Sequence, residues 1–214
     1  LDTSKLAEAV QGVPTVYIRQ GEVRTDGVSV GVLIDESGSM CGGRIEAARD
    51  TAILINEALG DSPKVELFIY GHSGDSRFDG ATELIIYREK TFKPRYSLGS
   101  VEARCENRDG IAILETAQRI RKQTQNHVLL FVLSDGEPSA SRYRGSKAIE
   151  HTKECVDKVE KMDFTVIQVC INMCYDPKTM FKHWVVLEDM SNLAFSLGKV
   201  IKKATLSAAK VHVL

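Results

Sequence analysis

The stretch VSVGVLIDESGS, residues 28–39, decides the fold class. Residues 28–34 are almost wholly apolar and rich in β-branched side chains, which is typical of a strand that is buried on both faces of a sheet. The chain then changes at once to acidic, hydroxyl-bearing and glycine residues at 35–39. This change predicts a central strand whose carboxyl end opens into a polar loop.

Three further apolar runs of the same kind follow along the chain. They predict strands at residues 65–70, 128–133 and 164–171, and a weaker pattern predicts another strand at 83–87. Each run is short and nearly continuous in its apolar character, as in a parallel sheet that helices cover on both sides. The sequence therefore predicts several neighbouring parallel strands.

Amphipathic segments separate these strands. Helices are expected at residues 43–59, 109–124, 146–162 and 191–203, and Asp109 is expected to cap the second of them. Strands that alternate with helices through short connections predict an α/β fold, with a doubly wound, mostly parallel central sheet and helices on both faces. The first helix would turn one apolar stripe to the sheet, made of Ile45, Ala48, Ala52, Ile55 and Leu59.

The chain of 214 residues is long enough for one complete domain, which we place at residues 28–203. Residues 71–105 hold many Gly, Ser, Arg and Pro residues and are expected to form an irregular insertion near the polar loops. Residues 1–27 are expected to be an N-terminal extension or an edge strand, with the strand at 15–20. Residues 204–214 are expected to be a C-terminal tail.

The composition excludes several classes of protein. The net charge is -1, so no basic face for nucleic acid is expected. No apolar run reaches the ~20 residues that a membrane-spanning helix needs. The five cysteines are odd in number and scattered, which argues against a disulfide framework and for a reducing, cytoplasmic location.

Small oxygen-bearing side chains follow the predicted strands. Asp35, Ser37 and Ser39 come after the first strand, and Asp135 follows the strand at 128–133. Because ligands of doubly wound sheets bind beyond the carboxyl ends of the strands, these loops are expected to meet at one site. The loop before the second helix is expected to join them there through Asn107 and Asp109.

These oxygens suit a hard cation. Gly38 lets the backbone turn so that the hydroxyls of Ser37 and Ser39 converge, whereas Glu36 alternates with them and should point away. Mg²⁺ prefers oxygen ligands in octahedral geometry and retains water, while Mn²⁺ and Ca²⁺ are chemically compatible with the same donors. Alone, Asp-x-Ser-x-Ser is also an ordinary set of turn and cap residues. Asp135 after a separate apolar strand, together with the register of residues 107–113, favours a metal site over this ordinary reading.

The pattern Asp35-x-Ser37-x-Ser39 after an apolar strand resembles the metal-ion-dependent adhesion site (MIDAS) of von Willebrand factor A (vWA) domains. In that family a threonine from a second loop and an aspartate from a third loop complete the site. Asp135, between Ser134 and Gly136, matches the third loop. The second loop departs from the family pattern, because Asn107 stands where the metal-contacting threonine is common and Asp109 stands at the following threonine.

The form Glu-Asn-x-Asp-Gly-x-Ala at residues 106–112, with Asp-x-Ser-Gly-Ser-Met at 35–40, is similar to an intracellular branch of the family. That branch includes a cobaltochelatase subunit and proteins that work with AAA+ ATPases of the MoxR kind. The resemblance implies a module that is not an enzyme, a non-catalytic subunit of an ATP-dependent complex. Its metal would recruit an Asp or Glu of a protein partner, because a cation held mainly by neutral hydroxyls stays open to an anionic oxygen.

Two alternatives remain open from the residues. An open magnesium position also polarises phosphate esters, which would make the protein a metal-assisted phosphoester hydrolase, but no phosphate-binding glycine loop or general base is apparent. An extracellular adhesion domain is the other, and the free cysteines weigh against it. His72 is interpreted as a polar loop residue, and Phe181 and Trp184 are interpreted as core.

Overall fold

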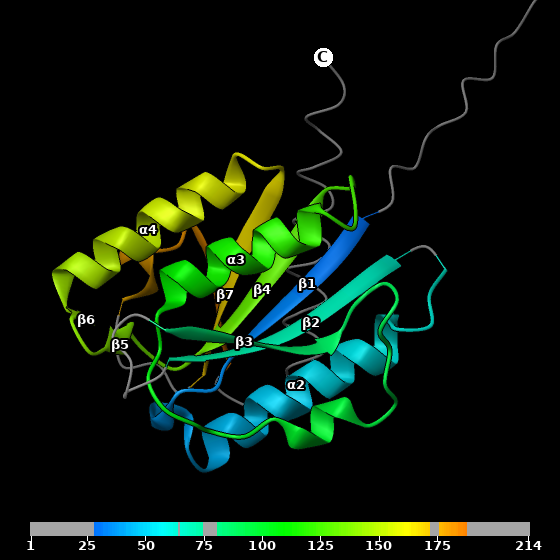
Figure 1. Ribbon diagram of the computed structural model, residues 1–214, viewed down its shortest axis with the longest axis horizontal. Coiled ribbons are helices and arrows are strands. Elements are labelled where there is room, and N and C mark those ends of the chain that lie inside the picture. The colour runs from blue at the N-terminus through cyan, green and yellow to red at the C-terminus, as the bar shows by residue number, and fades with distance from the viewer. Residues whose placement is uncertain (1–27, 64, 75–80, 172–175, 188–214) are drawn as a thin grey trace, which may run out of the picture.

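The computed structural model describes residues 28–63, 65–74, 81–171 and 176–187, and its centre is a six-stranded sheet (Figure 1). The strands lie in the order β3-β2-β1-β4-β7-β8. All neighbours pair in parallel except β3, which is antiparallel to β2. The strands are β1 at Val28–Asp35, β2 at Val65–Gly74, β3 at Thr82–Arg88, β4 at Val128–Ser134, β7 at Phe164–Ile171 and β8 at His183–Leu187.

Helices cover both faces of this sheet (Figure 1). Helix α2, Gly43–Leu59, packs on one face, and α3, Asp109–Arg121, lies beside α4, Ser146–Glu160, on the other. The predicted α/β class with a mostly parallel, doubly wound sheet is therefore confirmed. The short elements are η2 at Gly38–Met40, η3 at Ser97–Ser100, η4 at Pro177–Thr179, and a hairpin of β5, Ser139–Ala140, with β6, Tyr143–Arg144.

Two apolar layers form the core, one on each side of the sheet. Val32 and Ile34 of β1 belong to the layer under α2, whereas Leu33 between them belongs to the layer under α3 and α4. This alternation is the period of two that a strand imposes on its side chains. The expected stripe of α2 is buried in the first layer, with only Leu59 at its end partly exposed.

Strand β1 sits at the switch point of the sheet, because β2 flanks it on one side and β4 on the other. The chain leaves β1 for α2 and β2, and returns through α3 to β4 on the opposite side. The carboxyl ends of β1 and β4 therefore open side by side, at Asp35 and Ser134. This is the place where doubly wound sheets bind ligands.

The segment at residues 71–105 is more regular than its composition predicts. Strand β2 continues to Gly74, and the weak strand expected at 83–87 is present as β3. Lys90 pairs with Glu66 near the start of β2, so the chain has crossed to the far end of the sheet there. It then returns, and the Arg104 amide donates to the Glu36 carbonyl in the first polar loop. Only part of the described segment is therefore irregular. Residues 71–74 and 104–105 lie at the polar loops, and so does Ala81, whose carbonyl accepts a hydrogen bond from Arg108 in the loop before α3.

Some boundaries differ from those expected. Helix α3 ends at Arg121 and α4 ends at Glu160, both before the residues that the pattern favoured. Strand β8 and the hairpin of β5 and β6 were not predicted. The strand expected at 15–20, the helix expected at 191–203, and the terminal segments 1–27 and 204–214 lie outside the described residues.

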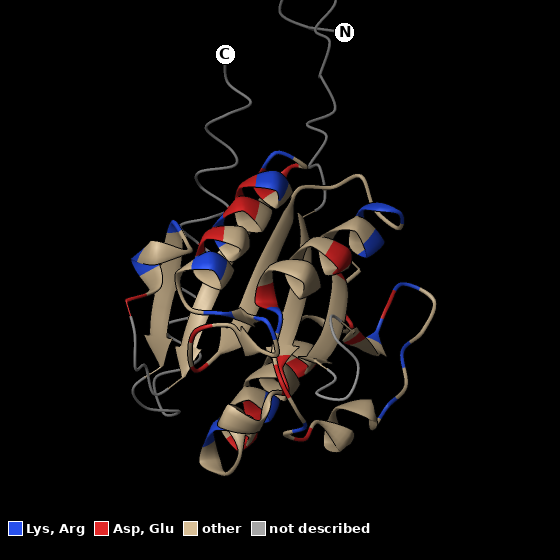
Figure 2. Cartoon of the chain, turned by 60° about the vertical axis from the view of Figure 1, so that its left-hand side comes forward, with Lys and Arg blue, Asp and Glu red and all other residues tan. Residues whose placement is uncertain are grey.

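None of the helices in the described ranges is long and apolar enough to cross a lipid bilayer. Figure 2 shows acidic and basic residues interspersed along the helices and loops of the described ranges.

Candidate metal site

The first polar loop folds its oxygens toward one point. Asp35 ends β1 and is fully buried, and its Oδ1 accepts the backbone N–H of Ser37 at 2.8 Å. The turn that follows brings the hydroxyls of Ser37 and Ser39 to 3.0 Å from each other. Two hydroxyls and one carboxylate thus converge within five residues of chain, as the spacing predicts.

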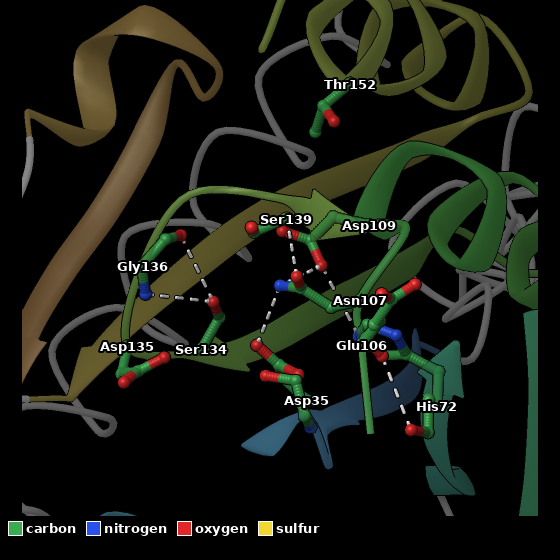
Figure 3. Close-up of polar contacts among 12 residues, drawn as sticks. Asp35, His72, Glu106, Asn107, Asp109, Ser134, Asp135, Gly136, Ser139 and Thr152 are labelled. Carbon is green, nitrogen blue, oxygen red and sulfur yellow. Dashed lines mark hydrogen bonds and ion pairs between the residues drawn. The ribbon is translucent and has the colours of Figure 1, made fainter. Parts of the chain in front are cut away.

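The second loop contributes Asn107, which lies between two carboxylates (Figure 3). Its Nδ2 donates to Asp35 Oδ2 at 3.2 Å and to Asp109 Oδ1 at 3.1 Å. Its Oδ1 accepts the backbone N–H of Ser139 at 2.6 Å. The side-chain amide is therefore fixed in one orientation, with its amino group toward the carboxylates and its oxygen toward the hairpin.

Asp109 does not cap α3 as expected. The N-terminal cap is Arg108, without a side-chain hydrogen bond, and Asp109 is the first residue of the helix. Its buried carboxylate turns instead toward Asn107 and the site. The contact with Asn107 at the polar loops, which the sequence also predicted for Asp109, takes the place of capping.

The third loop, which follows β4, adds Asp135 to these polar side chains. Asp135 follows β4 and its Oδ1 accepts the Ser39 hydroxyl at 2.9 Å, which joins the third loop to the first. Its Oδ2 lies 3.1 Å from Nη1 of Arg44, at the start of α2. The structure therefore brings all six residues singled out from the sequence into one hydrogen-bonded network: Asp35, Ser37, Ser39, Asn107, Asp109 and Asp135.

Negative charge is concentrated here. Burial raises the pKa of Asp109 well above its usual range, and the charges of Asp35 and Asp135 raise it further against the opposing hydrogen bond from Asn107. Burial also raises the pKa of Asp135; the Ser39 hydrogen bond and Arg44 oppose this, and the charge of Asp35 adds to it. A divalent cation among these groups would offset the repulsion between the carboxylates, which adds to the effect of burial on both pKa values.

His72 lies beneath the site and is not the polar loop residue that was expected. It belongs to β2, is fully buried, and pairs in register with Asp35. Its Nε2 is 3.8 Å from Asp109 Oδ1, and neither ring nitrogen has a hydrogen-bond partner. Burial lowers the pKa of His72, which favours the neutral ring, although the charge of Asp35 opposes this.

Glu36 points away from the hydroxyls, as expected, and into a separate buried cluster. Its Oε1 accepts the Tyr87 hydroxyl at 2.7 Å, and its Oε2 accepts Arg104 Nε at 2.8 Å. Burial raises the pKa of Glu36, against the effect of both partners. Gly71 makes the space, because a Cβ there would overlap Oε1 of Glu36. The first loop is thereby anchored to β2, to β3 and to the segment that returns from the far end of the sheet.

Arg108 is the largest fully buried side chain of the described ranges and holds the second loop. Its guanidinium donates to the carbonyls of Ala81, at 2.6 Å, and Ser141, at 3.5 Å, and its Nη2 lies 3.6 Å from Glu106 Oε2. It therefore ties the loop of Asn107 to the hairpin. The sequence predicted neither the contacts of Arg108 nor those of Arg44, because an arginine beside a loop motif is common and carries no pattern of its own.

A hollow of about 860 Å³ opens above these residues. Ser37, Ser39, Asn107 and Asp135 form part of its lining, and the hairpin forms one wall. The site can therefore be reached by a ligand from outside the chain.

The donors fit a hard cation better than a zinc ion. Across the described ranges, no group of three or more His, Cys, Asp and Glu side chains is arranged to hold a metal. The network instead combines hydroxyls with carboxylates, a donor set that suits Mg²⁺. As the structure places it, the Asn107 oxygen faces Ser139, so its side chain serves the carboxylates as a hydrogen-bond donor.

No protein-family model and no curated protein sequence matches the chain. Solved structures do resemble it in fold. The VWA domain of SpRpn10 aligns at 17% identity with a TM-score of 0.51, over 78% of this chain and 93% of that one. The vWF domain of the type V pili tip protein Mfa5 from Porphyromonas gingivalis aligns at 9% identity with a TM-score of 0.52, over 84% of this chain and 95% of that one.

The pilus adhesin SpaC from Lactobacillus rhamnosus GG aligns at 12% identity with a TM-score of 0.62, over 84% of this chain. The chain spans only 31% of the length of that adhesin. At these identities the similarity concerns the fold alone. The chain has a vWA-like fold.

Proposed function

We propose that this protein is a metal-dependent interaction module that binds Mg²⁺ at a MIDAS-type site and recruits an acidic residue of a partner protein. The observation that carries the proposal is the single network of hydroxyls and carboxylates from three loops at the switch point of the sheet. Mn²⁺ and Ca²⁺ would find the same oxygen donors.

Each residue has a distinct part in this proposal. Ser37 and Ser39 offer neutral hydroxyl oxygens, and Asp35 and Asp135 supply the negative charge around them. Asn107 and Asp109 hold the second loop against Asp35 and add to that charge. When bound, the cation would offer an electrophilic position to a carboxylate that enters through the hollow.

The partner class and location follow from the sequence resemblance. Residues 106–112 are similar to the intracellular branch, so we propose a AAA+ ATPase of the MoxR kind, or a chelatase-like complex, as the partner of a non-catalytic subunit. The cysteines described at positions 41, 105 and 155 form no disulfide, which supports the cytoplasmic location that we propose.

The test compares the wild-type protein with Asp35→Ala in a Mn²⁺ titration followed by electron paramagnetic resonance. Asp50→Ala, which removes an exposed carboxylate of α2, is the matched control. We expect one bound ion in the wild type and the control, and a loss of affinity of about 100-fold or more in Asp35→Ala, with an unchanged circular dichroism spectrum. Equal Mn²⁺ binding by Asp35→Ala would contradict the proposal.

One observation favours the phosphoester hydrolase as a second candidate. Arg44, Arg142 and Arg144 line the hollow and would suit a phosphate. His72, which lies beside Asp109, has no exposed surface and cannot reach a substrate as a general base. Turnover of generic phosphate esters with Mg²⁺, lost in Asp35→Ala, would favour the hydrolase over the interaction module.

A further inference from the structure

Four of the five large apolar side chains that are exposed in the described ranges lie on two neighbouring elements. Ile53 and Leu54 are on α2, and Phe92 and Tyr96 are on the loop between β3 and η3. Tyr96 is 80% exposed and Phe92 is 47% exposed. Apolar side chains that gather in one exposed area commonly mark a place where another protein binds. This area is therefore a candidate interaction surface.

The two elements lie side by side on the same face of the sheet. Leu98 of η3 and Val101 after it pack in the apolar layer under α2, and η3 contacts that helix (Figure 1). Arg88, at the end of β3, donates through Nη1 to Asn56 Oδ1 at 2.7 Å, and through Nη2 to the Gly60 carbonyl after α2. The outer side of α2 therefore adjoins the loop that leads to η3.

The exposed side of α2 is the acidic half of this surface. Asp50, Ile53, Leu54 and Glu57 follow the spacing i, i+3, i+4, i+7, so they lie on one face of the helix, and each is exposed. Within the described ranges, neither Asp50 nor Glu57 is paired with a basic side chain. Two carboxylates without ionic partners thus flank two aliphatic side chains.

The loop is the basic half of the surface. Lys93 and Arg95 lie between Phe92 and Tyr96 along the chain, and all four are exposed. Neither cation has a carboxylate partner in the part of the chain that the structure describes, and the Arg95 guanidinium lies 5.6 Å from the centre of the Tyr96 ring. Aromatic and arginine side chains are the types that most often contribute strongly to binding at protein interfaces.

The loop is held in place at its base. The backbone N–H of Glu89 donates to the Phe92 carbonyl at 2.7 Å, and the N–H of Phe92 donates to the Glu89 carbonyl at 3.3 Å. The buried Glu89 carboxylate accepts the Tyr70 hydroxyl at 2.9 Å and is paired with the Arg119 guanidinium of α3. The exposed side chains of the loop therefore start from a fixed backbone, which lowers the entropy that binding would cost.

We propose that this surface binds the same surface of a second copy of the chain, so that the protein forms a dimer with two-fold symmetry. Its two halves carry opposite charges, and both carry apolar side chains. A two-fold rotation places the loop of one copy on the α2 face of the other, and the reverse. The two cations and the two carboxylates cancel, so the surface has no net charge to attract a nucleic acid or an anionic membrane. A second copy is the partner that these charges fit.

The dimer would carry two candidate metal sites. None of the residues that make up the proposed dimer surface lines the hollow above the metal-site residues, so the hollow of each copy stays open. A partner with two acidic residues at a suitable separation would then bind both copies at once and gain affinity through the linkage of the two contacts. Dimerisation itself needs no metal, so the inference does not rest on the proposed function.

The test is sedimentation equilibrium of the full chain in EDTA, over a range of protein concentrations. The variant Lys93→Glu with Arg95→Glu reverses the charge of the loop, and the variant Asp50→Lys with Glu57→Lys reverses the charge of the α2 face. All four side chains are exposed, so both variants should fold.

A third variant, Lys147→Glu with Lys153→Glu, is the matched control. It changes the net charge as much as the loop variant does, but on the exposed side of α4, on the other face of the sheet.

We expect the wild type and the α4 control to dimerise with similar affinity. Each of the two charge-reversed variants should dimerise at least about tenfold more weakly, because both of its contacts then join like charges. An equal mixture of the two should form dimers again, since each acidic group then faces a basic group in both contacts. Recovery in the mixture would also show that both variants are folded.

The other outcomes overturn the inference. A wild type that stays monomeric at every concentration would exclude the dimer and leave the proposed metal-dependent function standing. A dimer that persists in either charge-reversed variant, or that the α4 control weakens equally, would show that this surface is not the interface. Two variants that fail to recover dimers when mixed would overturn the pairing of the loop with the α2 face.

Discussion

At the scale of single residues, the Asn107 side chain determines how the carboxylates of the candidate site are arranged. Its amino group separates two carboxylates that would otherwise face each other, and its oxygen is occupied by the hairpin. The family pattern has a threonine at this place, which could not donate to both carboxylates at once. The asparagine thus stabilises the metal-free arrangement while it keeps the loops together.

Asn107→Asp should destabilise the metal-free protein and make it dependent on metal. The change replaces two donated hydrogen bonds with repulsion among carboxylates, so we expect a loss of about 2–4 kcal/mol in the free energy of unfolding. Saturating Mg²⁺ should restore most of it, because the added carboxylate becomes useful to a cation. Urea denaturation in EDTA and in Mg²⁺ measures both effects.

Asn126→Asp is the matched control for that experiment. Asn126 also donates to a carboxylate, Glu66 at 3.4 Å, but near the opposite end of the sheet. It should lose stability without any recovery in Mg²⁺. Equal recovery in the two variants would show that the metal does not act at Asn107.

Arg44 brings a positive charge into the candidate site. Its guanidinium pairs with Asp135 at 3.1 Å and donates to the Ser39 carbonyl at 2.7 Å. Arg44→Gln should raise the affinity for Mn²⁺ by about threefold, because a competing positive charge is removed from a partly exposed pair. Isothermal titration calorimetry measures the change, with Arg49→Gln on the same helix as the control. A fall in affinity specific to Arg44→Gln would show instead that this arginine positions the ligands.

The six candidate site residues could be found from the sequence because each lies within a few residues of an apolar strand or at a helix start. Their contacts could not. The burial of His72, the buried pairs of Glu36 and the hub formed by Arg108 depend on segments that are distant along the chain. Such side chains show no local pattern, since their partners are fixed only when the sheet is assembled.

At the scale of elements, the first loop is held by a buried cluster beneath it. Glu36 joins Tyr87 of β3 and Arg104 of the returning segment, and Gly71 of β2 leaves the space for its carboxylate. The loop that carries Asp35 is thus anchored to its neighbours on one side of the sheet. The oxygens of this loop are therefore held in position without a bound cation.

Gly71→Ala should therefore damage the site as well as the fold. The added methyl group would displace the fully buried Glu36, which we expect to cost about 1–3 kcal/mol of stability and to weaken Mn²⁺ binding. Thermal unfolding and the Mn²⁺ titration measure the two effects. Gly99→Ala is the control, because a Cβ there meets no atom within 4 Å. Normal Mn²⁺ affinity in Gly71→Ala would show that the cluster does not position the loop.

The sequence patterns predicted the long strands but not the short strands β5, β6 and β8. Strands β1, β2, β4 and β7 are each seven residues long or more and each contains a run of mainly apolar residues, so the sequence pattern identifies them. The hairpin has strands of two residues, too short for any period. Strand β8 begins with exposed residues, including Trp184, which was expected in the core and is 38% exposed, whereas Phe181 is buried.

At the scale of the whole molecule, the order of the strands brings the polar loops of the candidate site together. The chain reverses direction across the sheet at β1, so loops separated by about a hundred residues meet at one end. Helices on both faces bury the sheet and leave that end accessible through the hollow. The architecture explains why residues so distant in sequence lie together at one site.

Metal binding should also appear as stability of the entire domain. A ligand that binds only the folded state adds about 2.7 kcal/mol at a concentration 100 times its dissociation constant. The melting temperature should therefore rise with Mg²⁺ or Mn²⁺ in the wild type and stay constant in Asp35→Ala. A parallel rise in both proteins would assign the effect to general ion binding.

The most direct test is a crystal structure of the protein with excess Mn²⁺, measured with anomalous scattering at the manganese edge. The account predicts one strong peak among the side-chain oxygens of Ser37, Ser39 and Asp135, with Asp35 close behind them. The absence of a peak there, with these side chains turned apart, would contradict it.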